Sequence, residues 1–255
     1  MLSNKNPLVS IITTVKNGEK HLEQCIQSVI NQDYKNIEYI MIDGGSTDNT
    51  IDIIKKYEKN ISYWISEKDI GIYDGMNKGI KNATGYYICV LNADDYYTDN
   101  HQISIVMKRL INNNVEFVYS DAKILKINGE IKEKGSSPLS TDILLRNYIF
   151  HPTLICKKTV FTKIGLYNTN YMIAADYDFV LRLYLGNFKW EKVATFSVCI
   201  REGGMSYYNP KALEEYKSIL KSYNLFTIKP KLNYYSILIK RKILQFNFFK
   251  NILSK

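Results

Sequence analysis

Short apolar runs alternate with amphipathic segments along the first half of the chain. The runs are rich in β-branched and aromatic residues and predict strands at 8–15, 37–42, 61–66 and 86–91. The segments between them space their apolar residues as a helix does and predict helices at 19–32, 48–59 and 73–82. Strand–helix alternation of this kind predicts a parallel sheet with helices on both faces.

The pattern is less regular after residue 95. Further helices are predicted at 101–113, 158–164 and 177–186, and further strands at 116–125, 154–158 and 189–199. Asn128-Gly129 is a hairpin turn signal, so residues 117–134 are predicted to form a small antiparallel ribbon. Because no internal repeat or low-complexity linker interrupts the chain, we expect one continuous domain over 1–206 and a helical tail over 207–255.

The positive charge is concentrated at the end of the chain. The net charge is +9, and residues 207–255 hold ten Lys or Arg against two Glu, a net +8. The first 206 residues are therefore close to neutral, which argues against a nucleic-acid surface there. No apolar run approaches the roughly 20 residues that span a bilayer, and the N-terminal stretch lacks a basic start and a cleavage site. We expect a cytoplasmic protein.

The four cysteines are far apart in the sequence, and the three histidines form no metal-binding pattern. This spacing favours reduced, buried thiols over disulfides or zinc ligands. A zinc hydrolase is not indicated.

Three acidic clusters follow apolar segments. They contain Asp43, the pair Asp94-Asp95, and Asp176 with Asp178. Ligands of an open α/β sheet bind at the carboxyl ends of its strands. Because carboxylates gathered there repel one another, they need a cation or a role as a base. We therefore predict that the clusters converge on a site for a metal ion and a diphosphate.

The segment Asn92-Ala93-Asp94-Asp95 comes directly after the apolar strand 86–91. Its carboxylates and amide offer oxygen ligands to Mg²⁺ or Mn²⁺, which would bridge two phosphates. The alternative is a turn that caps the helix predicted near residue 101.

The other acidic segments allow a structural interpretation as well. Two glycines after Asp43 permit a sharp turn close to a ligand, and Asp43 could accept from a base or ribose, but the segment could also be an ordinary turn with Asp48 as helix cap. Residues 66–78 could bind a sugar or form a solvated loop, with Asn77 and Lys78 on a helix surface. Asp176 could be a general base or a helix cap.

Five segments in order resemble family 2 glycosyltransferases of the GT-A fold. They are VSIITTVKNGEKHLEQCIQSVINQ, IDGGSTDNT, EKDIGIYDGMNKGI, NADD and AADYDFVLRL. The resemblance runs from about Leu8 to Ser206. Within the family, the second, third and fourth of these segments are similar to those of bacterial polysaccharide-assembly enzymes, such as colanic-acid-type transferases. It implies a Rossmann-like, mostly parallel central sheet, with a nucleotide-binding half at 1–95 and an acceptor-binding half at 96–206.

The resemblance also implies roles for single residues. Those that would bind the donor nucleotide are Thr13, Asp43, Asp69, Asn92, Ala93 and Asp94. Asp94 would also bind the metal with Asp95 nearby, Asp176 would be the catalytic base, and Arg182 and residues 203–206 would flank the site. Two positions depart from the family pattern: Asn92 stands where many members have Asp, and Ala175 where many have Glu.

The function implied by the resemblance is inverting, Mn²⁺- or Mg²⁺-dependent transfer of a sugar from a nucleotide-sugar, taken to be a UDP-sugar, to a glycan or lipid-linked acceptor. A non-catalytic nucleotide-sugar-binding or scaffold protein is the alternative, which Asn92 favours. A nucleotidyltransferase is disfavoured because no glycine-rich basic loop lies near the first strand.

Residues 229–253 place apolar and aromatic side chains three or four positions apart and add four basic residues from Lys240 onward. Such a basic amphipathic helix can lie in an anionic membrane interface. It could equally dock on its own domain or on a second copy.

Overall fold

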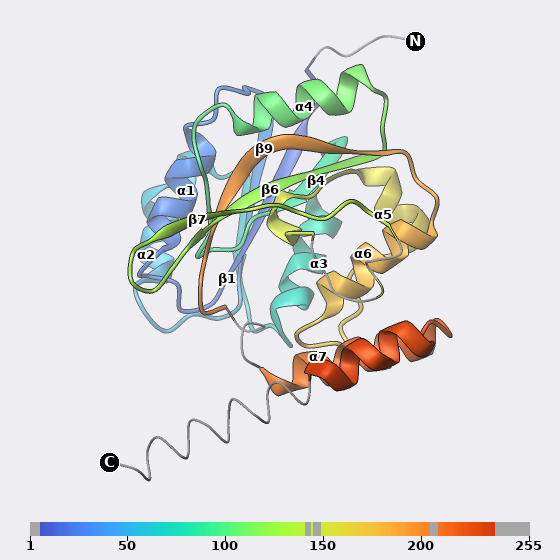
Figure 1. Cartoon of the computed structure of the whole chain (residues 1–255). Helices are drawn as coiled ribbons and strands as arrows, with labels where there is room; N and C mark the ends of the chain where they lie inside the picture. Colours follow the sequence, from blue (N-terminus) through green and yellow to red (C-terminus); the bar gives the residue numbers. More distant parts are fainter. Residues whose placement is uncertain (1–5, 141–143, 145–148, 205–208, 238–255) are drawn as a thin grey trace.

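A computed structural model describes residues 6–140, 144, 149–204 and 209–237. The strands found there form one sheet in the order β3-β2-β1-β4-β8-β6-β9-β5, with β7 beside β6 (Figure 1). The strands are β1 (Val9–Val15), β2 (Ile37–Asp43), β3 (Tyr63–Ser66), β4 (Tyr87–Val90), β5 (Tyr96–Tyr97), β6 (Phe117–Leu125), β7 (Ile131–Lys134), β8 (Ile155–Lys157) and β9 (Trp190–Arg201).

The helices as far as residue 185 lie where the apolar spacing predicts them, and the helix at 210–222 falls within the segment expected to be a helical tail. They are α1 (Leu22–Ile30), α2 (Thr50–Lys56), α3 (Ile72–Asn82), α4 (Gln102–Asn112), α5 (Lys158–Ile164), α6 (Ala175–Leu185) and α7 (Pro210–Ser222), with 3₁₀ turns at Glu58–Asn60 and His151–Thr153. Residues 228–237 are helical too. The predicted segments are thus confirmed, most of them one to three residues too long at their ends.

Strand directions follow the prediction in the first half and add detail in the second. β1 pairs in parallel with β2 and β4, and β2 with β3. β8 runs antiparallel between β4 and β6, whereas β6 and β9 are parallel. The predicted hairpin is confirmed, since β6 and β7 pair antiparallel and Gly129 takes φ +85° in the turn. β5 was not predicted, because two residues are too few to show a pattern.

Both faces of the sheet are buried. Val9, Ile11 and Val15 of β1 join one apolar cluster with α1, α2 and α4, whereas Ile12 points to the opposite cluster, formed with α3, α5 and α6. Figure 1 shows these two helical layers on either side of the strands. The sequence alternates in this way because successive side chains of a strand point to opposite faces. The four cysteines are buried and free, as predicted.

α7 is part of the same core although it lies in the segment predicted to be a tail. Its Ile219 and Leu220 are buried with α6, and the rings of Tyr216 and Tyr177 are 4.6 Å apart. The domain boundary after residue 206 stays a prediction, but apolar packing continues beyond it. Among the described residues, no helix is long and apolar enough to cross a bilayer.

Candidate active site

A cavity of about 640 Å³ opens at the carboxyl end of β4. Asn92, Asp94 and Asp95 line one part of it, and Asp176 and Tyr73 line another. Two of the three acidic clusters, about 80 residues apart in the chain, therefore share one cavity. The β6–β7 ribbon and the end of β9 complete the wall with basic and acidic side chains, namely Lys126, Lys132, Glu133, Lys134, Arg201 and Glu202.

Asp176 lies in the first turn of α6, where it meets Tyr73 of α3. Its Oδ1 accepts hydrogen bonds from the backbone N–H of Tyr177 at 2.8 Å and from the Tyr73 hydroxyl at 3.2 Å. The same hydroxyl lies 2.8 Å from the carbonyl oxygen of Ile173. Burial raises the pKa of the Asp176 carboxyl to about 6, against the lowering effect of both hydrogen bonds. The group is thus ionised at neutral pH and able to accept a proton.

Glu215 of α7 holds the chain immediately before α6. Its carboxylate accepts hydrogen bonds from three consecutive backbone N–H groups, at 3.0 Å from Met172 and 2.9 Å from Ile173 and Ala174. The negative charge of Glu215 also raises the pKa of Asp176. The geometry of the Asp176 region therefore depends on a residue 39 positions later in the chain.

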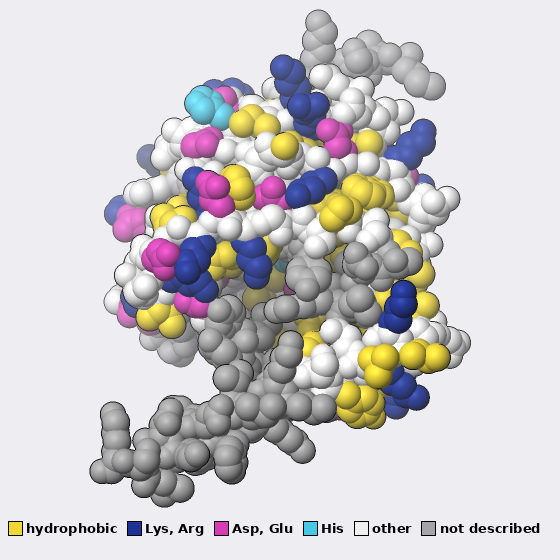
Figure 2. Space-filling model, in the orientation of Figure 1, with side chains coloured by type: hydrophobic (Ala, Val, Ile, Leu, Met, Phe, Trp, Pro, Cys, Tyr) yellow, Lys and Arg dark blue, Asp and Glu magenta, His cyan; other side chains and the backbone are white. Residues whose placement is uncertain are grey.

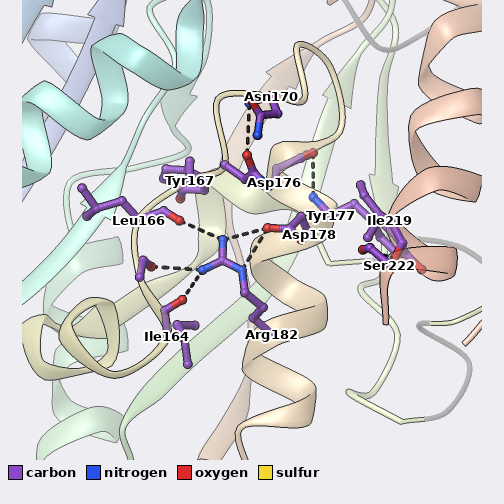
Figure 3. A network of polar contacts seen from close by, with 12 residues as sticks. Ile164, Leu166, Tyr167, Asn170, Asp176, Tyr177, Asp178, Arg182, Ile219 and Ser222 are labelled. Carbon is purple, nitrogen blue, oxygen red and sulfur yellow. Dashed lines mark hydrogen bonds and ion pairs between the residues drawn. The ribbon is translucent and has the colours of Figure 1, made fainter. Parts of the chain in front are cut away.

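Arg182 and Asp178 stabilise the same helix from its other side (Figure 3). The Arg182 guanidinium donates to Asp178 Oδ2 at 2.9 Å, to the Leu166 carbonyl at 2.8 Å and to the Ile164 carbonyl. Asp178 is buried and accepts a further bond from the Tyr223 hydroxyl. Arg182 thus ties the loop after α5 to α6, and its predicted place beside the site corresponds to a structural contact.

The carboxylates of Asp94 and Asp95 lie in different environments. Asp95 is 2% exposed, and its two oxygens accept from the Asn92 amide at 3.0 Å and from the Arg201 backbone N–H at 3.1 Å. Burial, together with the charge of Asp94, raises the pKa of Asp95 to about 8. Asp94 is less buried and faces the cavity. Asp94 is therefore the more available metal ligand of the two.

The residues at this end of the cavity fit a divalent cation that is shared with a diphosphate. Within the described ranges no three His, Cys, Asp or Glu side chains cluster as a metal site. However, the buried Oδ1 of Asn92 has no hydrogen-bond partner, and Asn92, two positions before Asp94, lines the same cavity. Mg²⁺ is commonly held by one or two carboxylates, with phosphate oxygens as the remaining ligands. Asp94 and Asn92 supply such a partial set of oxygens.

Asp43 and Thr13 do not line the cavity. Asp43 is fully buried, and its carboxylate accepts from the N–H groups of Gly45 and Ser46 and from the hydroxyls of Ser46 and Ser66. Thr13 is fully buried too, with its hydroxyl 3.2 Å from the Tyr39 hydroxyl and 3.8 Å from the Cys25 sulfur. Both side chains already have partners within the fold, and their contacts with a nucleotide stay predictions.

Asp69 occupies a space that two glycines leave open. A Cβ atom added at Gly44 or Gly75 would lie 3.0 or 2.8 Å from Asp69 Oδ2. The ammonium of Lys78 fixes this carboxylate at 2.5 Å and also contacts Glu67 at 2.8 Å. Asp69 does not line the cavity wall, and its contact with the base or ribose stays a prediction.

Asn77 differs from its predicted place on a helix surface. It is buried in α3 and exchanges two hydrogen bonds with the backbone of Tyr167, at 2.8 and 3.0 Å. It therefore joins α3 to the loop before α6.

Sequence reasoning missed Tyr73, Glu215 and Arg201. Tyr73 lies inside the segment EKDIGIYDGMNKGI, so the match of that segment was an available signal. Glu215 and Arg201 belong to no segment that suggests a ligand. Only the packing of α7 on α6 and the end of β9 beside β5 brings them to the site.

Comparison with known proteins identifies the family. The profile described as "Glycosyl transferase family 2" matches residues 10–216. The chain belongs to this family. The match covers the sheet, the cavity and most of the first two turns of α7, and it makes the protein a glycosyltransferase, as the resemblance of the five segments implies.

Curated relatives of this glycosyltransferase carry related names. A PGL/p-HBAD biosynthesis glycosyltransferase of Mycobacterium bovis (strain BCG / Pasteur 1173P2) is 31% identical over 182 residues, which are 70% of this chain and 70% of that protein. An uncharacterized glycosyltransferase of Rickettsia typhi is 35% identical over 185 residues, 68% of this chain and 57% of that protein.

Solved structures confirm the predicted GT-A fold. S. aureus TarS 1–349 in complex with UDP-GlcNAc matches with a TM-score of 0.70 and 18% identity, over 84% of this chain and 65% of that one. The mannosyltransferase PcManGT of Pyrobaculum calidifontis, in complex with GDP-Man and Mn²⁺, matches with a TM-score of 0.60 and 16% identity, over 95% and 81% of the two chains.

We expect Glu215→Ala to destabilise the protein by about 2–4 kcal/mol, because three backbone N–H groups lose a charged acceptor. Asp52→Ala is the control: this acid is exposed on α2, and its removal should cost about 0.5 kcal/mol or less. Urea unfolding followed by circular dichroism measures both. Equal losses of stability in the two variants would show that the hydrogen bonds between Glu215 and residues 172–174 do not stabilise the fold.

Proposed function

We propose that this glycosyltransferase is an inverting, metal-dependent enzyme of bacterial surface polysaccharide synthesis. It transfers a sugar from a UDP-sugar to a hydroxyl of a glycan or lipid-linked acceptor. The observation that carries the proposal is the shared cavity: Asp94 and Asp176 line the same space of about 640 Å³. The UDP-GlcNAc complex of TarS and the GDP-Man and Mn²⁺ complex of PcManGT support the donor class and the cofactor by similarity of fold.

Asp176 is the base of the proposed reaction. It takes the proton of the acceptor hydroxyl, whose oxygen then forms a bond to the anomeric carbon of the donor. The bond from that carbon to the diphosphate oxygen breaks, and its electron pair leaves with UDP. Attack from the face opposite the diphosphate inverts the anomeric centre. The Tyr73 hydroxyl keeps the carboxylate oriented through its 3.2 Å hydrogen bond.

The donor diphosphate is held at the other end of the cavity. Asp94 and the Oδ1 of Asn92 would hold Mn²⁺ or Mg²⁺, which supplies positive charge to the departing diphosphate. Asp95 belongs to the same site, where its bonds to Asn92 and to the Arg201 backbone keep the turn in place. Ala93, between Asn92 and Asp94, contributes its backbone.

The nucleotide is assigned to the loops that follow β1, β2 and β3. Asn17 and Ser46 link the first two loops, since Asn17 accepts from the Thr47 N–H at 2.8 Å and its own N–H donates to the Ser46 hydroxyl at 2.7 Å. Thr13 and Asp43 would contact the base of the nucleotide from beneath these loops, and Asp69 would contact the nucleotide base or the ribose.

The proposed setting is the cytoplasm, with peripheral contact to the inner face of the membrane through residues 229–253. A lipid-linked acceptor would make such contact useful. Residues 238–253 lie outside the described part of the chain. Residues 229–237 are described and bear on this contact directly.

Donor binding tests the metal end of the cavity. We expect UDP with Mn²⁺ to raise the Tm of the wild-type protein, because ligand at about a hundred times its Kd adds about 2.7 kcal/mol of stability. Asp94→Ala should lose most of this shift, whereas the control Asp52→Ala, at an exposed position of α2, should keep it. A full shift in Asp94→Ala would contradict the assignment of this carboxylate.

The rate of sugar transfer tests the end of the cavity that holds Asp176. Asp176→Asn should retain the Tm shift with UDP and Mn²⁺ but lower transfer about 10²–10⁴-fold, since the amide cannot take the proton. The assay measures UDP released from the UDP-sugar that stabilises the protein most, with glycan or lipid-linked acceptors present. If Asp176→Asn binds the donor and transfers the sugar at the wild-type rate, Asp176 is excluded as the catalytic base. Donor binding without transfer in the wild type would favour a non-catalytic binding protein.

The pKa of Asp176 predicts how the rate depends on pH. Because the ionised form is the base and burial raises its pKa to about 6, kcat should rise with pH through about 6 and then level off. The Tyr73 hydrogen bond lowers this pKa by stabilising the ionised form. Tyr73→Phe should therefore move the rising limb to higher pH. If the rising limb lies at the same pH in the wild type and in Tyr73→Phe, Tyr73 does not influence the pKa of Asp176.

A further inference from the structure

A second cavity, which we call the lysine pocket, is lined by residues between 217 and 235. It has a volume of about 480 Å³ and is formed by α7, the following turn and the helix 228–237. Its lining residues are Lys217, Lys221, Asn224, Phe226, Lys231 and Tyr235. No acidic residue belongs to this lining, so the pocket has the charge of an anion site.

The three lysines differ in how far the protein neutralises them. Lys217 lies 4.0 Å from Glu214, and its ammonium stands 4.9 Å from the centre of the Tyr234 ring. Lys221 and Lys231 are exposed and form no ion pair within the described ranges. Two ammonium groups at the pocket are therefore available to an external anion.

An exposed apolar row lies next to the lysine pocket. Ile228, Leu232 and Tyr235 are 78%, 67% and 50% exposed, and their spacing of four and three residues puts them on one face of the helix. Figure 2 shows hydrophobic and lysine or arginine side chains together at the lower right, over the elements that are orange to red in Figure 1. Single exposed apolar residues are ordinary, but a row on one helix face beside cations indicates an interface.

The helix 228–237 is fixed to the domain by its opposite face. Tyr234 is buried, its ring lies 5.8 Å from that of Phe226, and its hydroxyl donates to Glu214 at 2.5 Å. Docking on the domain, which the sequence left as one alternative, thus accounts for one face of this helix. The apolar row of Ile228, Leu232 and Tyr235 remains on the outside.

We infer that this surface binds an anionic membrane, with the lysine pocket taking the phosphate of a lipid headgroup and the apolar row entering the acyl boundary. This inference deepens the proposed membrane contact and rests on it. A free phosphate would use only the lysines and leave the apolar row without a role. A bilayer interface offers anionic phosphate and hydrocarbon side by side, which matches both halves of the surface.

Position on α7 connects this surface with the active site. Tyr216 lines the catalytic cavity, whereas Lys217, the next residue, lines the lysine pocket. One helix therefore separates the proposed acceptor region from the proposed membrane surface. Binding there would hold the catalytic cavity close to acceptors anchored in the same membrane.

The test is sedimentation of the full chain with phosphatidylcholine vesicles, with and without phosphatidylglycerol. We expect the wild type to sediment only with the anionic vesicles. The double variant Lys221→Glu/Lys231→Glu should lose at least about tenfold in apparent affinity, and Ile228→Ser/Leu232→Ser should lose a similar factor. The matched control Lys35→Glu/Lys108→Glu makes the same change in charge at exposed positions elsewhere and should bind as the wild type does.

The remaining outcomes overturn the inference. Equal losses in the control and in Lys221→Glu/Lys231→Glu would indicate a general charge effect. A wild type that does not sediment would exclude membrane binding, and light scattering that shows a dimer lost in Ile228→Ser/Leu232→Ser would assign the apolar row to a second copy. The Tm shift with UDP and Mn²⁺ separates this inference from the proposed function: a normal shift without vesicle binding leaves the transferase proposal intact.

Discussion

Parallel pairing of β1 with β2 and β4 is the constraint on which the whole site depends. In-register pairs such as Val15 with Asp43 bring the ends of these strands to one edge of the sheet. The loops beyond that edge are then close enough to bond to one another, as Gly18 does to the Thr50 hydroxyl at 2.8 Å. The acid pair after β4 emerges at the same edge. Local sequence places Asp43 and Asp94 at or just after strand ends, but only the pairing brings those ends to one side of the sheet, whereas Asp176 reaches the cavity from the first turn of α6.

Hydrogen-bond partners separate the structural aspartates from those available to a ligand. Asp43 and Asp178 are buried, and donors from the chain itself occupy both oxygens of each carboxylate. Asp94 and Asp176 instead face a cavity. A buried carboxylate whose oxygens already accept from donors of the chain has none left for a ligand, whereas one that faces a cavity retains oxygens for a substrate or cation. The motif alone does not make this distinction, because all four aspartates follow or begin a regular element.

The sequence was most informative where structure is local. Apolar periodicity predicted the alternating elements, and Asn128-Gly129 predicted the turn between β6 and β7, because backbone preference and side-chain spacing act over a few residues. It could not predict β5, whose two residues pair with β9, or Glu215, whose three bonds reach across to residues 172–174. Nor could it predict that the donors around Asp43 include Ser66 of another strand. Each of these features depends on contacts between distant segments.

α7 shows how a single helix can belong to two interfaces. Ile219 and Leu220 bury one side of it, and Glu215 fixes the segment that leads into α6. Lys217 and Lys221, one turn apart, lie together on a different side. Because the buried side already determines the rotation of the helix, the direction in which these lysines point is set by the core that positions Asp176. The packing of the domain core therefore sets the orientation of the lysine pocket relative to the catalytic cavity. A membrane bound at the pocket would then lie at a fixed angle to the cavity.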